Sequence, residues 1–313
     1  MNDEHVVWAY RLLLDREAAP EEIRDCVSQY PNVQTLRSVI LQSPEFALKS
    51  GGNGAFSHSL KVFADLSPYG VDGSLYVNLS DYIGLSIANA WYEPEEVALV
   101  QSKVKPGQTF VDVGANVGFF SLLASHLVGP KGKVFTFEPV PETLSYLNKS
   151  ISKNAFCSNV TVIEAIVTDR HSDDLEIAFQ PLAEGSGSSG GSYLVSKGDL
   201  LPDHMHRKAV PADALVNFIP KGKRVDFIKI DVEGAEPLAM KGAESILVPQ
   251  SPLIMSEVHP SQLQSVSKTD WRGYFDLMKG YGYTPFFFRG GELAEEARHL
   301  DDGQVYNVAF IKK

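Results

Sequence analysis

The amino-acid sequence predicts an α/β fold: a seven-stranded, mostly parallel sheet with helices on both faces, preceded by a small helical module. Short apolar runs alternate with helical patterns after residue 93, as in sheets built from crossover units. The runs around Ile228 and Ile254 are almost wholly apolar, which is typical of strands buried on both faces. The last two runs lack a helical pattern between them, so we expect an antiparallel closing pair. The expected strands are 109–113, 133–138, 160–167, 225–231, 252–258, 283–288 and 304–311; the expected helices are 93–104, 117–128, 141–154, 235–247 and 270–281.

The residue pattern divides the chain into three segments. Residues 1–50 are interpreted as a helical accessory module, residues 51–74 as a linker, and residues 75–313 as the main domain, opening with a strand at 75–79. Because helices this short bury little surface alone, we expect the module to dock on the main domain, on a partner or on a second copy. Within the module the expected helices surround Val7 to Leu14, 21–30 and 34–42, with a last turn at 43–46, and the hinge is Gly51–Gly54.

The segment 168–212 interrupts the alternation of strands and helices. Residues 175–179 are expected to add an extra strand, whereas residues 183–192 are almost pure glycine and serine. Such a composition predicts a flexible loop that forms no core. Two interpretations stay open for this loop: a solvated connector, or a flap over the substrate.

Composition narrows the class of protein. The chain has 313 residues, of which 44% are hydrophobic, and a net charge of −11, which argues against a broad nucleic-acid-binding surface. No apolar run approaches the roughly 20 residues that span a bilayer, and the N-terminus carries acids where an export signal carries Lys or Arg. Cys26 and Cys157 lie in separate regions, so we expect no disulfide framework and a cytoplasmic location.

The most informative motif is a strand, a glycine turn and a helix within Thr109–Ser121. In such Rossmann-like units, glycines let a ligand approach the backbone, and the helix N-terminus offers free N–H groups. The strand ends at Asp112, which would repel the pyrophosphate of NAD; S-adenosylmethionine (AdoMet) carries an ammonium and a sulfonium and no phosphate. The next strand ends at Glu138, where a carboxylate accepts ribose hydroxyls. The motif therefore predicts AdoMet, bound by Asp112, Gly114, Asn116, Gly118 and Glu138.

Two further motifs complete a family pattern. They are Phe227-Ile-Lys-Ile-Asp-Val-Glu-Gly-Ala-Glu236 with Gly242, and Ser256-Glu-Val-His-Pro260. With the glycine turn and Tyr92-Glu-Pro94, they resemble the FkbM-type AdoMet-dependent methyltransferases over roughly residues 75–311. The resemblance implies a class I methyltransferase fold and transfer of a methyl group, mostly to oxygen, on natural products, sugars or lipids. Residues 5–48 are similar to a helical module found beside carbohydrate-active enzymes.

Methyl transfer to oxygen requires collinear reactants and a base for the hydroxyl proton. Candidates lie where the central strands end. We rank Glu257 first, since burial in an apolar run raises a carboxyl pKa, then Asp231 and then His259. Asp231 is also a candidate contact for the cofactor ammonium. Glu233 and Glu236 are interpreted as helix-start residues rather than catalysts.

The remaining ligand candidates follow from strand position. Glu164 and Ala165, just past the third strand, are expected to flank the adenine. Asp231 and Glu257 together offer a site for Mg²⁺, although we expect no metal in the site. The expected acceptor is a small molecule or glycan, with no nucleic acid and no membrane span.

Two other function classes stay open. An NAD-linked oxidoreductase predicts a Tyr-x-x-x-Lys pair or a catalytic cysteine, and neither is well placed in this sequence. A non-catalytic binding protein on the same fold would use residues 3–50 as an interaction module. The presence of Asp112, Glu138, Asp231 and Glu257 favours the enzyme.

Overall fold

The computed structural model describes residues 2–14, 16–30, 32–41, 43, 61–79, 81–180, 190–195, 199–203 and 205–312. The expected last helical turn of the module, the hinge at Gly51–Gly54 and most of the Gly/Ser loop (183–189) lie outside the described residues. Within the described part of the chain, no helix is long and apolar enough to cross a membrane.

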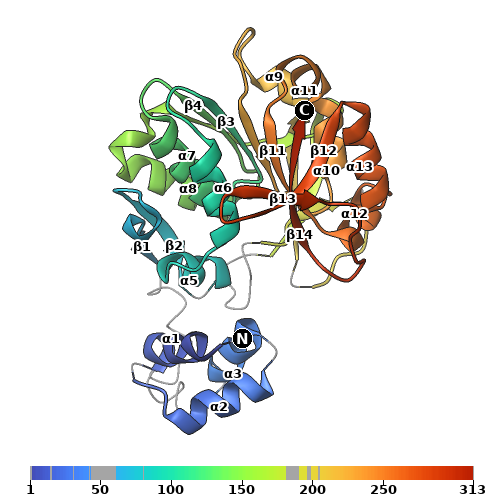
Figure 1. Cartoon of the computed structure of the whole chain (residues 1–313). Helices are drawn as coiled ribbons and strands as arrows, with labels where there is room; N and C mark the ends of the chain where they lie inside the picture. The colour runs from blue at the N-terminus through green and yellow to red at the C-terminus, as the bar shows by residue number, and fades with distance from the viewer. Residues whose placement is uncertain are drawn as a thin grey trace.

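An eight-stranded sheet forms the centre of the main domain, in the order β13-β12-β14-β11-β10-β3-β4-β5 (Figure 1). Strands β11, β10, β3, β4 and β5 are parallel neighbours, and β14 runs antiparallel to β11 and β12. The expected mostly parallel sheet with an antiparallel end is confirmed. The strands are β3 (Thr109–Val113), β4 (Lys133–Phe137), β5 (Val160–Ile163), β10 (Phe227–Ile230), β11 (Leu253–Val258), β12 (Tyr283–Arg289), β13 (Glu292–Glu296) and β14 (Tyr306–Lys312).

The eighth strand, β13, extends the edge that the sequence pattern left at seven strands. It pairs antiparallel with β12 across Gly290 and Gly291, whose φ angles are 55° and 83°. Two successive residues with positive φ suit a tight hairpin turn, and a Gly-Gly pair is its usual sequence signal.

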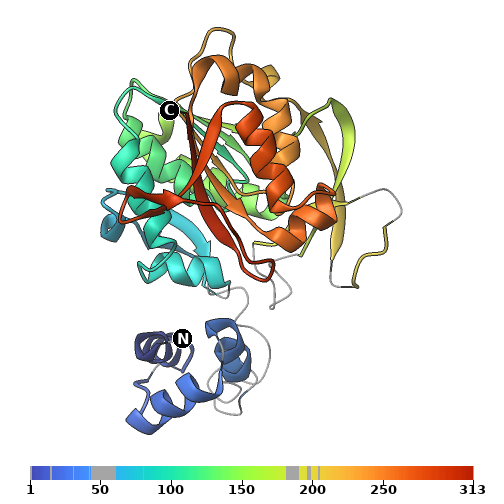
Figure 2. The same ribbon diagram turned by 45° about the vertical axis from the view of Figure 1, so that its right-hand side comes forward.

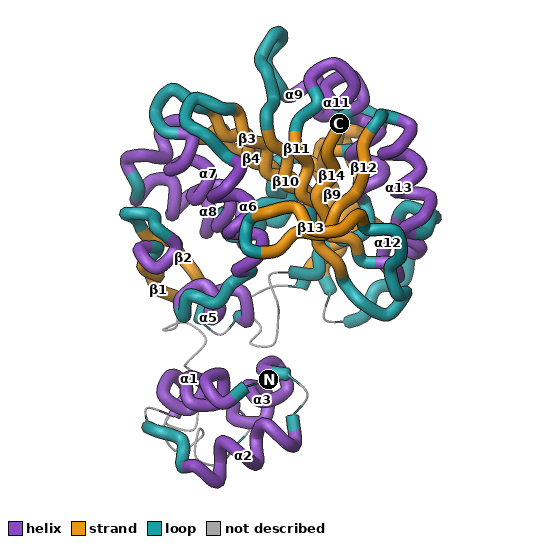
Figure 3. The backbone as a smooth tube through the Cα atoms, viewed as in Figure 1, coloured by secondary structure: helices purple, strands orange, loops and turns teal. Residues whose placement is uncertain are grey.

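Helices cover both faces of the sheet (Figures 2 and 3). Alternate strand residues point to opposite faces, so Phe110 and Phe227 join one hydrophobic core while Val111 and Ile228 join the other. The first core packs against α6 (Pro94–Lys103), α7 (Phe119–Val128) and α8 (Pro141–Lys153). The second packs against α9 (Leu215–Phe218), α10 (Glu236–Gly242), α11 (Glu244–Gln250), α12 (Pro260–Val266) and α13 (Trp271–Gly280). The single helix expected at 235–247 is therefore two.

The expected linker is shorter than the sequence indicated. Residues Lys61–Asp65 form β1, which pairs antiparallel with β2 (Ser74–Asn78), and a short turn of helix, η2 (Ser67–Tyr69), connects them. Ala64, Leu66 and Tyr69 are buried in the first core. This hairpin packs on α8 because apolar residues hidden among polar neighbours find a surface only in the folded protein. It is followed by α5 (Tyr82–Ala88).

A second sheet lies beside the carboxyl ends of the central strands. Its order is β6-β9-β7-β8: β6 (Ile166–Val167), β9 (His206–Asp213), β7 (Ser172–Phe179) and β8 (Tyr193–Val195). The extra strand expected at 175–179 is confirmed as part of β7. The strand expected at 160–167 divides at Glu164-Ala165, because β5 and β6 belong to different sheets. This second sheet places the residues before β8 against the central strand ends.

The N-terminal helices form a cluster of their own. They are α1 (Asp3–Leu14), α2 (Pro20–Gln29) and α3 (Val33–Leu41), around a small core that includes Val6, Leu13, Cys26 and Leu36. The His5 ring lies 4.8 Å from that of Trp91, so α1 contacts the main domain just before Tyr92. Cys26 and Cys157 are free thiols.

Candidate active site

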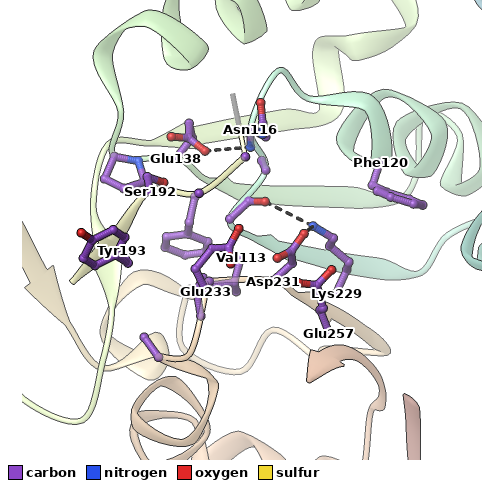
Figure 4. Close-up of a pocket in the computed structure, with 18 of the residues that line it drawn as sticks. Val113, Asn116, Phe120, Glu138, Ser192, Tyr193, Lys229, Asp231, Glu233 and Glu257 are labelled. Atoms are coloured by element: carbon purple, nitrogen blue, oxygen red, sulfur yellow. Dashed lines mark hydrogen bonds and ion pairs between the residues drawn. The ribbon is translucent and has the colours of Figure 1, made fainter. Parts of the chain in front are cut away.

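A pocket opens where β3, β4, β10 and β11 end (Figure 4). It encloses about 1100 Å³ of empty space, its open mouth included. The carboxyl ends of parallel strands are where open α/β sheets bind ligands. Two further segments form its walls: Tyr92-Glu93 ahead of α6, and Gly190–Leu194 at the start of β8.

The glycine turn is shaped by packing against the neighbouring strands. Gly114 and Gly118 have φ angles of 79° and 94°, a region that favours glycine. A Cβ atom on Gly114 would lie 1.9 Å from the backbone oxygen of Asp231, and one on Gly118 would lie 2.3 Å from Leu147 Cδ1. These glycines are therefore required by the protein itself, and the approach of a ligand is not needed to explain them.

Glu138 connects the glycine turn to the pocket, at the place expected from the sequence. One of its oxygens accepts the Asn116 N–H at 2.7 Å, and the other accepts the Val140 N–H at 2.8 Å and the Thr143 hydroxyl at 2.9 Å. Both Glu138 and Asn116 line the pocket, and Asn116 Oδ1 is buried without a partner. This orphaned acceptor suits a ligand that carries N–H groups.

Asp112 lies beneath the turn, not in the pocket. Its side chain is fully buried, Oδ2 accepts the Ser121 hydroxyl at 2.6 Å, and it is not among the residues that line the pocket. The structure thus differs from the direct cofactor contact expected of Asp112. The reason is strand register: Asp112 lies on the same face as Phe110, which is covered by α7. Burial raises its pKa.

Lys229 is the residue that sequence reasoning missed. It is only 6% exposed, and its ammonium donates to Asp231 Oδ2 and to the Gly114 carbonyl, each at 3.2 Å. Burial disfavours the charged form, but Asp231, Asp112 and Glu93 outweigh it and raise the pKa of Lys229. The sequence did hold a signal, because one lysine interrupts the otherwise apolar strand Phe227–Ile230. It is a permanent cation at the centre of the site.

Three carboxylates gather at the ends of β10 and β11. Oxygens of Asp231, Glu233 and Glu257 all lie within 4.8 Å of one another, close enough to share a proton or a cation. Burial, followed by the charge of Asp231, raises the pKa of Glu257 well above its ordinary value. A Mg²⁺ ion between Asp231 and Glu257 would compete with Lys229 for Asp231. Glu257 and Asp231 are thus brought together as expected.

The two residues expected to begin the next helix behave differently. Glu236 begins α10 as expected, and its Oε1 accepts the N–H groups of Val232 and Gly234 at 3.0 and 3.2 Å. Glu233 instead lines the pocket, in a left-handed backbone conformation with φ of 52°. The helix starts later than its motif indicates, and that leaves the Glu233 side chain beside the cluster.

The other expected site residues divide between the pocket and the surface. Ala165 is buried and lines the pocket. Glu164 is exposed and pairs with Lys208 outside the pocket. His259 lies at the start of α12, where its Nδ1 is 3.0 Å from the Ser261 hydroxyl, and it is not a lining residue. Glu93, which the sequence placed only in an entry segment, lines the pocket.

The family follows from a comparison of this sequence with known ones. The model of the family described as "Methyltransferase FkbM domain" matches residues 112–285, more than half of the chain. The chain belongs to the FkbM methyltransferase family. The match covers the glycine turn, Glu138, Asp231 and Glu257, and the sheet order is that of a Rossmann-like class I methyltransferase fold.

Individual relatives are distant. The methyltransferase sdnD of Sordaria araneosa is 28% identical over 161 residues, 43% of this chain and 60% of that protein, so this chain spans about three fifths of its length. The 31-O-demethyl-FK506 methyltransferase FkbM of Streptomyces tacrolimicus is 28% identical over 230 residues, 64% of this chain and 84% of that protein. Among solved structures, the methyltransferase FkbM of Methylobacillus flagellatus KT is 15% identical with a TM-score of 0.41, over 97% of this chain and 58% of that one.

The buried carboxyls of this FkbM-family site set the pH dependence of stability. Burial raises the pKa of Glu138, Glu233 and Glu236 to about 7 and that of Glu93 to about 8, from an ordinary value of 4.5. Between those values the folded protein binds more protons than the unfolded chain, so stability falls as pH rises. We expect a lower urea midpoint at about pH 8 than at about pH 5.5 for the ligand-free protein; an equal or higher midpoint at pH 8 would contradict this.

Proposed function

We propose that this protein is an AdoMet-dependent methyltransferase that methylates a hydroxyl group on a sugar-containing or other secondary metabolite. The observation that carries the proposal is the link between Glu138 and the glycine turn. The Glu138 carboxylate holds the Asn116 N–H at 2.7 Å while facing the pocket, so the turn and the ribose-binding acid form one unit. Membership of the FkbM family supports the same function.

The residues of the pocket suit the charges of AdoMet. Asn116 Oδ1 is available to accept from the ammonium, and Glu138 has lone pairs left for ribose hydroxyls. Ala165 and Tyr193 line the side on which the adenine would lie. Asp112 acts from beneath the turn through its negative charge and is not expected to touch the ligand. Carboxylates at the strand ends favour a cationic ligand over a pyrophosphate.

The carboxylates also suit acid–base work on an acceptor hydroxyl. Bound AdoMet supplies an electrophilic methyl group. Glu257 is placed to take the proton that the acceptor oxygen loses, since its raised pKa makes the ionised form a stronger base. Lys229 holds Asp231 at 3.2 Å and keeps that carboxylate ionised and fixed beside Glu257. One cation among Glu93, Asp231, Glu233 and Glu257 leaves the acceptor region acidic, which disfavours anionic acceptors.

Oxygen as the accepting atom is favoured by the need for a base. The relative from Streptomyces tacrolimicus is named for methylation of a 31-O-demethyl compound, which supports transfer to oxygen here. The helical module would then serve to bind the acceptor's carrier or a partner, in keeping with its contact to Trp91.

Titration calorimetry tests the cofactor. We expect AdoMet and its demethylated product to bind and NAD not to bind. Replacement Glu138→Ala should weaken AdoMet binding at least about tenfold, because the ribose loses its acceptor and the turn its anchor. Glu142→Ala, on α8 outside the pocket, is the matched control and should bind as the natural protein does. Tight NAD binding without AdoMet binding would overturn the proposal in favour of an oxidoreductase.

A further inference from the structure

A short segment crosses the pocket mouth before β8. Residues Gly190–Ser192, here called the strap, lead into β8, whose own pairing with β7 begins only at Tyr193. The strap and Tyr193 line the same pocket as Glu138 and Asn116 (Figure 4). Because the strap lies outside the strand ladder, its position over the pocket needs another attachment.

Glu233 provides that attachment. Its carboxylate accepts a hydrogen bond from the Gly191 backbone N–H. It also accepts the Gln262 side-chain amide at 2.6 Å, from the first turn of α12. One carboxylate on the turn after β10 therefore joins two segments that are about seventy residues apart in the sequence.

The backbone around Glu233 is built to keep this carboxylate in place. Glu233 has a φ of 52°, a conformation that costs a non-glycine residue free energy and persists where the surroundings enforce it. The next residue, Gly234, has no room for a side chain, since a Cβ atom would lie 2.4 Å from the Gln262 carbonyl oxygen. The Ser267 hydroxyl donates to the Gly234 carbonyl at 2.5 Å, which fixes the turn against the end of α12. The turn and α12 thus form one rigid support.

We propose that Glu233 is a positioning residue that fastens the strap over the pocket and so sets how fast a bound ligand leaves. In this role Glu233 exchanges no proton with the acceptor, in contrast to Glu257. The ligand named in the test rests on the proposed function, whereas the attachment of the strap does not.

Amide hydrogen exchange on the ligand-free full chain tests the attachment. Glu233→Gly removes the carboxylate and suits the left-handed backbone, so folding is not threatened. We expect exchange at residues 190–193 to accelerate about tenfold, while the glycine turn at 114–118 is unchanged. Gln262→Ala should give a smaller acceleration at the same residues. Unchanged exchange at 190–193 in Glu233→Gly would overturn the proposal.

The matched control loosens the same second sheet elsewhere. Glu176 pairs with Arg207 across β7 and β9 and does not line the pocket. Glu176→Gln should leave exchange at 190–193 as in the natural protein. Equal acceleration in this control would mean that general loosening of the sheet, not Glu233, governs the strap, and would also overturn the proposal.

A kinetic measurement tests the consequence for ligand release. We expect S-adenosylhomocysteine to dissociate about tenfold faster from Glu233→Gly, with an association rate changed by less. An unchanged dissociation rate would refute the role in release even if the strap exchanges faster. Failure of the natural protein to bind this ligand would instead refute the proposed function, while the exchange result would still decide whether Glu233 holds the strap.

Discussion

Replacing Lys229 with methionine is expected to lower the free energy of unfolding by about 3–5 kcal/mol. The substitution keeps most of the volume of a side chain that is only 6% exposed. It leaves Asp231, at 3.2 Å, and the fully buried Asp112 without the cation that compensates their charges. Removing one partner of a buried set of charges costs far more than the set contributes, because the remaining charges stay desolvated. Urea unfolding of the ligand-free protein measures the loss.

A second lysine variant separates burial from charge. Lys208 pairs with Glu164, whose side chain is half exposed, at the edge of the second sheet. Lys208→Met should therefore cost roughly 0–1 kcal/mol, as surface ion pairs do. If Lys229→Met costs no more than Lys208→Met, the carboxylates around Lys229 are not held by its charge, and its assigned place in the site is wrong.

Replacing Glu257 with glutamine is expected to reduce the rate of methyl transfer by about 10²–10⁴-fold. The amide keeps the size of the side chain but takes no proton from the acceptor hydroxyl. Affinity for S-adenosylhomocysteine should be retained, since Glu257 lies at the acceptor end of the pocket. Single-turnover rates and calorimetry on the same preparation measure the two quantities separately.

The pH profile gives an independent reading of Glu257. Burial and the charge of Asp231 raise its pKa, and only the ionised form accepts a proton, so the natural protein's rate should increase with pH, by at most about tenfold per unit. Glu257→Gln should abolish that slope. His259→Asn is the control, because His259 lies outside the pocket, and it should leave rate and slope unchanged. Full turnover in Glu257→Gln would remove Glu257 from the role of base.

Sequence periodicity was sufficient for most of the fold and for the places where chemistry collects. Apolar runs such as Phe227–Ile230 and the alternation of strands with helices predicted the parallel sheet, and β14 confirmed its antiparallel end. Residues that end strands, such as Glu138, Asp231 and Glu257, could be assigned to one edge because parallel strands all end there. Local order along the chain determines these features, so the sequence by itself contains them.

Only the tertiary structure decided which of these side chains meet. Asp112 is aligned with Lys229 by the register of β3 against β10, two strands more than a hundred residues apart, and α7 covers it. Glu233 enters the pocket because its turn adopts a positive φ, which no periodic pattern records. The β1 hairpin joins the core because α8 offers it an apolar surface. Pairing between distant segments and the direction of side chains at turns depend on the whole packed molecule, and there the reading of a linear pattern ends.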